Sequence, residues 1–269
     1  MNSVASRPAT SSRAVVASAP PAAEEEPFII TKEHRLFVEF CDSCRQARYI
    51  GICHGPPGVG KTLSARTYTQ GLDKGPVPGF PIFYTPQVAN NPRQIAKEIT
   101  RLREAGRYRR WVERNSETAW VWPPPDRTEL IIVDETDRLK MPGLEQLRDI
   151  FDRGGIGMVL IGMPGLEKRL SRYPQLFSRV GFVHPFRPLS NEEMQFILTQ
   201  KWAELGWKLR PDDFADAEAV AAIIRITEGN WRLLHRLWQQ IERILQINSL
   251  QVITSRVVEA ARENLMIGQ

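Results

Sequence analysis

Long apolar runs, cysteines and internal repeats are scarce in this chain, and each scarcity argues against a class of protein. No stretch of about 18 consecutive apolar residues occurs, so the sequence predicts no membrane-spanning helix. The N-terminus lacks the apolar central region of a secretory signal peptide, and three cysteines are too few for a disulfide framework. No repeat of roughly 20–50 residues indicates a solenoid. We therefore expect a cytoplasmic protein with no membrane partner.

The cysteines leave one metal-binding alternative open. Cys41 and Cys44 form a C-x-x-C pair, and Cys53 and His54 follow a few residues later. Cysteines at this spacing can be zinc ligands. The interpretation that we favour places Cys41 and Cys44 on a helix and Cys53 in a buried strand, because free cysteine is among the most buried residue types.

Size and charge set broad limits on fold and partners. The chain has 269 residues and is 42% hydrophobic. This is enough for one large core, or for one core with a small helical domain beside it. The formal net charge of +5 permits an anionic partner such as nucleic acid without specifying one.

The strongest local pattern is a phosphate-binding loop. Residues 55–62 fit G-x-x-x-x-G-K-[ST], after a predicted strand at 49–54 and before a predicted helix at 63–70. Glycines let successive backbone N–H groups point at phosphate oxygens, and the helix adds the partial positive charge of its N-terminus. The residues that we expect to contact a nucleotide here are Gly55, Pro56, Pro57, Gly58, Val59, Gly60, Lys61, Thr62 and Leu63.

Two side chains of this loop have specific expected roles. Lys61 should reach the β- and γ-phosphates of ATP, and the Thr62 hydroxyl should be a ligand of Mg²⁺. A chance glycine-rich turn is the alternative interpretation. The order strand, loop, helix argues against it, because this is the order that the motif requires.

A second motif ends the predicted strand at Leu130–Val133. A continuous apolar run of this kind is typical of a central parallel strand. Asp134 and Glu135 follow at its C-terminal end, where open α/β sheets bind ligands. This is a Walker B pattern, in which Asp134 would hold Mg²⁺ and Glu135 would polarise the attacking water. The alternative is that the two acids cap the next helix.

Apolar periodicity and turn residues predict a chain in three parts. Residues 1–27, rich in Ala, Ser and Pro, are expected to be a disordered tail. Residues 28–189 alternate helices and strands, including helices at 32–48 and 92–105 and a strand at 180–186. Residues 190–269 show helical spacing only, with capping signals at Ser190 and Thr254, and are expected to form a small bundle.

Residues 101–114 concentrate positive charge. They hold six arginines against two glutamates, an excess of four positive charges, with Tyr108 and Trp111 among them. Clustered arginine with interleaved aromatics suits a nucleic-acid backbone. The alternative is an ordinary solvated helix face, where arginine stems cover apolar surface. Trp120 and Trp122, before a run of three prolines, are expected to pack in a core or a lid.

Taken together, these motifs resemble the AAA+ ATPases. The P-loop domain, the Walker B acids and a C-terminal helical bundle are the shared features. Residues 134–139 (DETDRL), 161–170 (IGMPGLEKRL) and 228–232 (EGNWR) are similar to the TniB/TnsC/MuB transposition regulators. The resemblance covers about residues 30–265. It implies an α/β P-loop NTPase with a parallel sheet and a helical lid, ATP and Mg²⁺ as cofactors, and slow, assembly-dependent ATP hydrolysis.

The resemblance also implies roles for three positions, namely an arginine finger, sensor 2 and sensor 1. Arg179 matches the segment that carries an arginine finger for the neighbouring subunit's nucleotide, with Arg172 as the alternative. Arg232 matches the sensor-2 position, which touches the γ-phosphate. Met163 stands where AAA+ proteins usually have Asn, Thr or Ser as sensor 1, and a thioether cannot donate a hydrogen bond. That departure puts fast hydrolysis in doubt.

Related regulators assemble as rings or helical filaments on duplex DNA, so the resemblance implies the same partners here. The expected contacts to the DNA backbone are Arg103, Arg107, Arg109 and Arg110. Such contacts are independent of sequence. A transposase and a target-selector protein are the further implied partners. A protein-remodelling, helicase-loader or secretion-associated AAA+ ATPase is the alternative. A small-molecule kinase is a weaker one, since the helical bundle and Arg232 argue against it.

Overall fold

The computed structural model describes residues 28–72, 79–114, 125–210 and 212–265, without the side chains of residues 110–114. The predicted tail at 1–27, much of the loop expected at 71–81, and both Trp120 and Trp122 lie outside the described residues. Among the helices that the structure does describe, none is both long and apolar enough to cross a membrane.

A five-stranded parallel sheet is the centre of the α/β part, as predicted. Its strands run in the order β2-β3-β4-β1-β5. The strand after the P-loop's own strand is therefore not its neighbour, and β3, with its continuous apolar run, lies inside the sheet between β2 and β4. The strands are β1 (Ile50–His54), β2 (Phe80–Tyr84), β3 (Thr128–Val133), β4 (Gly157–Gly162) and β5 (Val180–Pro185).

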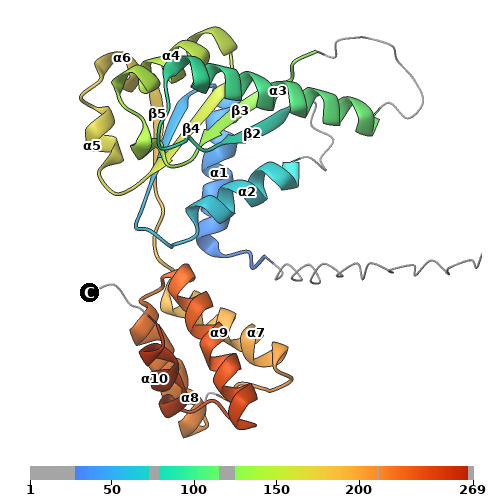
Figure 1. The fold of residues 1–269 in the computed structure, drawn as a ribbon, viewed down its shortest axis with the longest axis vertical. Coiled ribbons are helices and arrows are strands. Elements are labelled where there is room, and N and C mark those ends of the chain that lie inside the picture. Colours follow the sequence, from blue (N-terminus) through green and yellow to red (C-terminus); the bar gives the residue numbers. More distant parts are fainter. Residues whose placement is uncertain (1–27, 73–78, 115–124, 211, 266–269) are drawn as a thin grey trace, which may run out of the picture.

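Helices cover both faces of this sheet, because successive strand residues point to opposite sides. In β3, Leu130 and Ile132 pack against α1 (Lys32–Ala47) and α2 (Lys61–Leu72). Ile131 and Val133 belong to the core on the other face. That face is covered by the four helices α3 (Pro92–Arg114), α4 (Met141–Gly154), α5 (Leu166–Leu170) and α6 (Pro174–Phe177), and Figure 1 shows the layers.

The cysteines follow the favoured interpretation. Cys41 and Cys44 are fully buried on α1, and Cys53 is fully buried on β1. Burial raises the pKa of the Cys44 thiol to about 12, so this thiol is protonated at neutral pH. Over the described part of the chain, no group of three or more His, Cys, Asp or Glu side chains is placed to hold a metal ion.

The helix α3 continues well beyond its predicted end. Its expected range stopped at residue 105, before Gly106, but the helix runs to Arg114. Gly106 has a packing reason to be there, because a Cβ at this position would lie 2.3 Å from the ring of Phe80. The glycine does not end the helix. Its lack of a side chain lets the helix pass close to β2. The arginine-rich stretch is therefore the second half of one long helix.

Four further helices form the bundle that follows β5. Their apolar faces enclose a core of their own, in which Trp202 and Trp238 lie with ring centroids 5.3 Å apart. The predicted capping box at Ser190 and the cap at Thr254 are both present. Figure 1 places this bundle beside the α1–α2 side of the sheet layer. Its helices are α7 (Asn191–Glu204), α8 (Phe214–Thr227), α9 (Trp231–Asn248) and α10 (Ser255–Glu263).

Candidate nucleotide-binding site

The loop at 55–62 joins the C-terminal end of β1 to the start of α2. Gly58 and Gly60 have φ of 81° and 110°, a left-handed conformation that favours glycine. Gly55 is needed for another reason, since a Cβ there would lie 2.2 Å from the carbonyl oxygen of Phe186. The left-handed glycines and the close approach at Gly55 keep the loop tight, and the absence of side chains leaves its backbone accessible to a phosphate chain.

Lys61 is folded back onto this loop. Its Nζ donates to the carbonyl oxygens of Gly55 at 2.6 Å and Pro56 at 2.7 Å. Burial lowers the pKa of the ammonium group, while the nearby acids Asp134 and Asp137 oppose that shift. The lysine is thus held where a phosphate group on the loop would meet its charge.

The two expected Mg²⁺ ligands come together in the structure. The Thr62 hydroxyl donates to the Asp134 Oδ2 at 2.7 Å, although 72 residues separate them in the chain. Asp134 is buried, with 3% of its surface exposed. Mg²⁺ is bound in proteins by one or two such oxygen ligands together with substrate phosphates and water. The hydroxyl, the carboxylate and the adjoining phosphate loop fit that chemistry.

Glu135 stands next to this pair in a left-handed backbone conformation, with φ of 48°. Its N–H donates to the Asp134 Oδ1 at 2.9 Å. Its carboxylate is in an ion pair with Arg138, and Arg138 also donates to the Pro86 carbonyl oxygen at 2.9 Å. Sequence reasoning did not single out Arg138. Only the geometry shows that it lies at the same cleft and holds the glutamate.

Met163, the residue expected at the sensor-1 position, lies directly after β4. Its side chain is 43% exposed and lines the cleft. Its backbone N–H donates to Asp137 Oδ2 at 2.7 Å. Asp137 was not predicted as a site residue, and it brings a third carboxylate to the cleft beside Asp134 and Glu135.

Arg232 reaches the cleft from the bundle. Its backbone N–H donates to the Gly58 carbonyl oxygen at 2.9 Å, and the residue lines the same cleft as the P-loop and the Walker B acids. The cleft has a volume of about 590 Å³. Its other cationic or titratable lining residues are Arg66, Arg138 and His235, none of which the sequence singled out.

An apolar recess adjoins the loop on its other side. Val59, Gly60 and Leu63 form one wall, and Trp231 of α9 forms part of another. The recess has a volume of about 20 Å³, which is room for about one water molecule and not for a nucleotide base. Leu63 was predicted to contact the nucleotide, but the remaining members come from distant segments and carry no motif. They are Phe28, Ile29, Thr31, Ser64, Phe186 and Leu189.

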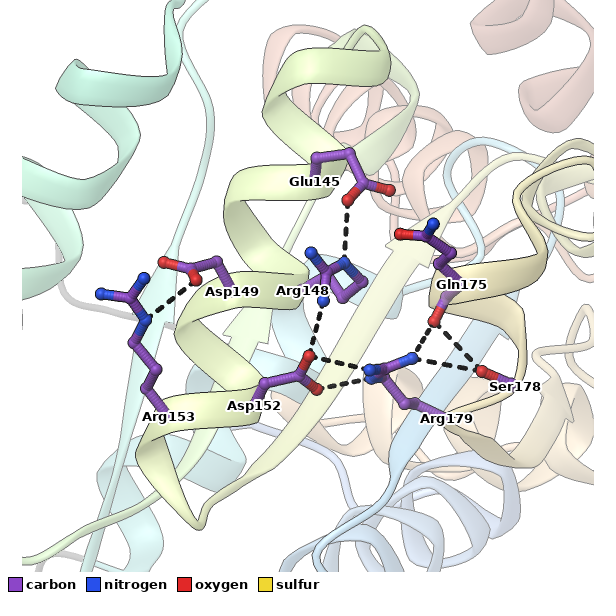
Figure 2. A network of polar contacts seen from close by, with 8 residues as sticks. All are labelled: Glu145, Arg148, Asp149, Asp152, Arg153, Gln175, Ser178 and Arg179. Carbon is purple, nitrogen blue, oxygen red and sulfur yellow. Dashed lines mark hydrogen bonds and ion pairs between the residues drawn. The ribbon is translucent and has the colours of Figure 1, made fainter.

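Arg179 lies at the N-terminal ends of the strands, opposite the end that carries the P-loop. Its carbonyl oxygen accepts from the Ile50 N–H at 3.0 Å, at the N-terminal end of the strand whose C-terminal end enters the P-loop. Five strand residues span about 16 Å, so this arginine does not serve the cleft of its own chain. Figure 2 shows its guanidinium bound to Asp152, which also accepts from Arg148 at 2.6 Å. Arg172, the alternative, is exposed nearby.

The four arginines predicted to contact DNA lie on the second half of α3. Arg103 forms an ion pair with Asp126, in which Nε and Nη2 both lie close to the Oδ2 atom, at 2.8 and 2.7 Å. Arg107 is half-buried and Arg109 exposed, and Tyr108 between them is 56% exposed. Arg110 belongs to α3, but its side chain lies outside the described residues. The structure thus places these arginines on one helix and leaves Arg103 already paired.

Comparisons with known proteins agree on the domain type. A family model described as an AAA domain matches residues 44–170. A potential ATP-binding protein of Staphylococcus aureus is 44% identical over 268 residues, which are 90% of this chain and 97% of the relative. The Mu-like prophage FluMu DNA transposition protein B of Haemophilus influenzae is 32% identical over 129 residues, 41% of this chain and 42% of that protein.

Solved structures of the same fold share little sequence with this chain. The RuvB Holliday junction branch migration motor of Thermotoga maritima has a TM-score of 0.59 and 17% identity, over 87% of this chain and 69% of RuvB. The ORC2 protein of Aeropyrum pernix, in its ADPNP–ADP complexes, has a TM-score of 0.61 and 16% identity, over 94% of this chain and 71% of ORC2. At these identities the likeness concerns the fold alone.

Proposed function

This chain is an AAA-domain protein of the family that includes the potential ATP-binding protein of Staphylococcus aureus, and from that premise we propose that it is an ATP-dependent, DNA-binding regulator of transposition. In this proposal it assembles on duplex DNA as a ring or helical filament and recruits a transposase. Residues 28–189 act as the ATPase unit and residues 190–269 as its helical lid.

The observation that carries the ATPase part is the meeting of Thr62 with Asp134 at 2.7 Å, beside Lys61 on the P-loop. Lys61 would hold the β- and γ-phosphates, and Thr62 and Asp134 would hold Mg²⁺. When bound, the metal ion would neutralise charge on the phosphate oxygens. Glu135, once released from Arg138, would orient the attacking water and accept its proton.

Two site features support slow, assembly-dependent turnover. Glu135 is held in an ion pair with Arg138, and Met163 offers no side-chain hydrogen-bond donor at the sensor-1 position. The proposed finger, Arg179, lies at the N-terminal ends of the strands, away from the cleft of its own chain. A neighbouring subunit would therefore have to supply it, which ties hydrolysis to assembly.

The proposed DNA binding and role in transposition are supported by the arginines of α3 and by one relative. The second half of α3 bears the arginine-rich stretch, and Tyr108 is exposed within it. The similarity to a DNA transposition protein B over 129 residues also supports a role in transposition. Because phosphate contacts carry no sequence information, we propose that binding is largely independent of DNA sequence. A transposase and a target selector would dock on the assembled form.

A filter-binding assay with duplex DNA of two unrelated sequences, with and without ATP, tests this proposal. We expect retention of both duplexes by the wild type with ATP, weak retention without it, and weak retention by Lys61→Ala in either case. ATP binding with no DNA retention under any condition would favour the alternative, a protein-remodelling or helicase-loader ATPase. Wild-type ATP affinity in Lys61→Ala would reject the P-loop assignment itself.

A further inference from the structure

The start of α9 is hydrogen-bonded to the P-loop. The Arg232 N–H donates to the Gly58 carbonyl oxygen at 2.9 Å, and the Asn230 Nδ2 donates to the Pro57 carbonyl oxygen at 3.0 Å. These two carbonyls bond to the bundle, whereas the carbonyls of Gly55 and Pro56 accept from Lys61. The bundle is thus bonded directly to the loop on which ATP would lie.

The Asn230 side chain both caps α9 and bonds to the P-loop. Its Oδ1 accepts from the Leu233 N–H at 3.2 Å and caps α9, while its Nδ2 makes the bond to Pro57. Asparagine carries an acceptor and two donors at its tip. Serine and threonine cap a helix about as well, but their hydroxyl is one bond closer to the backbone and leaves the Pro57 carbonyl out of reach.

Two glycines allow this close approach. Gly58 has φ of 81°, and a Cβ on it would lie 2.5 Å from the Asn230 Oδ1. Gly229 has φ of 74°, and a Cβ on it would lie 2.2 Å from the carbonyl oxygen of Leu189. A side chain at either position would push the start of α9 away from the loop. The contact between Asn230 and the P-loop is therefore built into the backbone on both sides.

We propose that Asn230 is a positioning residue for ATP, which holds the start of α9 against the P-loop and thereby keeps Arg232 over the cleft. This inference rests on the proposed binding of ATP at this site. Arg232 lines the cleft with Lys61, and its charge is close enough to contribute to the lowered pKa of Lys61. A guanidinium held there favours a nucleotide with a third phosphate, so Asn230 helps the site to distinguish ATP from ADP.

Binding of ATP and of ADP to a set of purified full-length variants tests the inference. Asn230→Ser and Asn230→Thr keep a cap on α9 and lose the bond to Pro57. Because one net hydrogen bond corresponds to roughly a 3- to 10-fold change in an equilibrium, we expect ATP affinity to fall by about that factor. ADP affinity should change less than about twofold. Wild-type ATP affinity in both variants, or equal loss of ATP and ADP, would overturn the inference.

Thr254→Ala is the matched control for stability. It removes a cap from α10 of the same bundle, where Thr254 accepts from the Val257 N–H, and it has no bond to the P-loop. We expect it to lower Tm by about 2–4 °C and to leave ATP affinity unchanged. An equal loss of ATP affinity in Thr254→Ala would mean that general destabilisation, and not the bond to Pro57, explains the Asn230 variants.

A double-mutant cycle with Arg232→Ala shows whether Asn230 acts through this arginine. We expect Arg232→Ala to lower ATP affinity with little effect on ADP, and the addition of Asn230→Ser to cause no further loss. Additive losses would contradict positioning through Arg232. Lys61→Ala tests the proposed ATP site separately from the role of Asn230. If ATP binding survives this substitution, the site itself is rejected, and not only the role of Asn230.

Discussion

Arg179 and Asp152 form a two-point ion pair, in which Nε and Nη2 of the arginine each donate to one carboxylate oxygen, at 2.5 and 2.8 Å. These hydrogen bonds, with the charge of Arg148 beside them, hold the pKa of Asp152 below its usual range. The remaining Nη1 of Arg179 donates to the Gln175 carbonyl and the Ser178 hydroxyl (Figure 2). An arginine finger at this position must leave all of these partners before it can reach a phosphate.

The first prediction concerns the sharing of one site by two subunits. If Arg179 acts on the neighbour's nucleotide, ATPase activity per subunit should rise with protein concentration, and Arg179→Ala should abolish the rise. A mixture of Arg179→Ala with Lys61→Ala should regain activity, because an interface can then combine an intact P-loop with an intact Arg179. The measurement is phosphate release across mixing ratios. No recovery at any ratio, with both proteins folded, would contradict a composite site.

The second prediction concerns the hold on this arginine. Asp152→Asn removes the carboxylate charge and one of the two acceptor oxygens, because an amide NH2 cannot accept a hydrogen bond from the guanidinium. We expect half-maximal ATPase activity at a lower protein concentration, because Arg179 leaves its partner more easily. Asp149→Asn is the matched control on the same helix, since Asp149 pairs with Arg153 at 2.9 Å and not with Arg179. A shift of equal size in the control would point to a general charge effect.

The third prediction concerns the water-activating carboxylate. Glu135→Gln keeps the size of the side chain and leaves Thr62 and Asp134 intact, so ATP should still bind. Loss of a general base lowers turnover by about 10²–10⁴-fold, and the trapped ATP state should bind DNA more tightly. Single-turnover hydrolysis and DNA retention measure the two effects. Glu129→Gln, near the other end of β3, is the control, and an unchanged rate in Glu135→Gln would exclude this role.

The fourth prediction concerns the arginines of α3. Replacing Arg107, Arg109 and Arg110 together with alanine should weaken binding about equally for unrelated duplexes. It should also flatten the slope of log affinity against log salt by about 0.9 for each phosphate that the variant no longer neutralises. The nucleotide affinity should stay unchanged, since the residues of α3 whose side chains the structure describes do not line the cleft.

The control for these arginines lies in the bundle. Arg225, Arg243 and Arg262 are exposed there, and their replacement by alanine changes the net charge by the same amount. The control should keep the wild-type salt slope. Equal slopes for the wild type and the α3 variant would show that these arginines are only a solvated face, and that DNA contacts must come from other residues.

The fifth prediction concerns acid stability. Burial, together with the nearby His54 and Arg187, lowers the pKa of His184 to about 4. In the unfolded chain this histidine binds a proton near its ordinary pKa of about 6.5. The unfolded state therefore binds more protons between pH 6.5 and 4, and stability falls as pH falls through this window.

His184→Phe should reduce that dependence. The ring of His184 lies 5.3 Å from that of Phe40 and 5.9 Å from that of Phe186, so a phenylalanine fits its surroundings chemically. Denaturant unfolding at pH 7, 6, 5 and 4 measures the effect. The variant should lose less stability than the wild type between pH 6.5 and 4. Parallel curves for the two proteins would contradict the assigned pKa.

Several elements could be predicted because their signals are local. The P-loop needs glycines, a lysine and a threonine at set spacing in one short segment, and the structure places them between β1 and α2 as expected. The apolar run of β3 indicated a central strand, and the Ser190 capping box marked the start of α7. These depend on period, spacing and capping chemistry within a few residues, which a sequence displays directly.

Contacts between distant segments could not be predicted in the same way. No motif predicts the pairing of Glu135 with Arg138, the small apolar recess between Phe28 and Trp231, or the ion pair of Arg179 with Asp152. The predicted end of α3 was wrong for a related reason. In the sequence Gly106 indicates the end of a helix, and only its close contact with Phe80 explains why a glycine stands there.

The sequence by itself determined the chemistry of the loop, the acids at the end of β3 and the alternation of helix and strand. Tertiary structure alone decided which groups meet. Thr62 and Asp134 are 72 residues apart and Asn230 and Pro57 are 173 residues apart, yet each pair is within hydrogen-bonding distance. The physical reason is that strand order and packing, which arise from the burial of both faces of the sheet, set these distances, and no spacing in the chain encodes them.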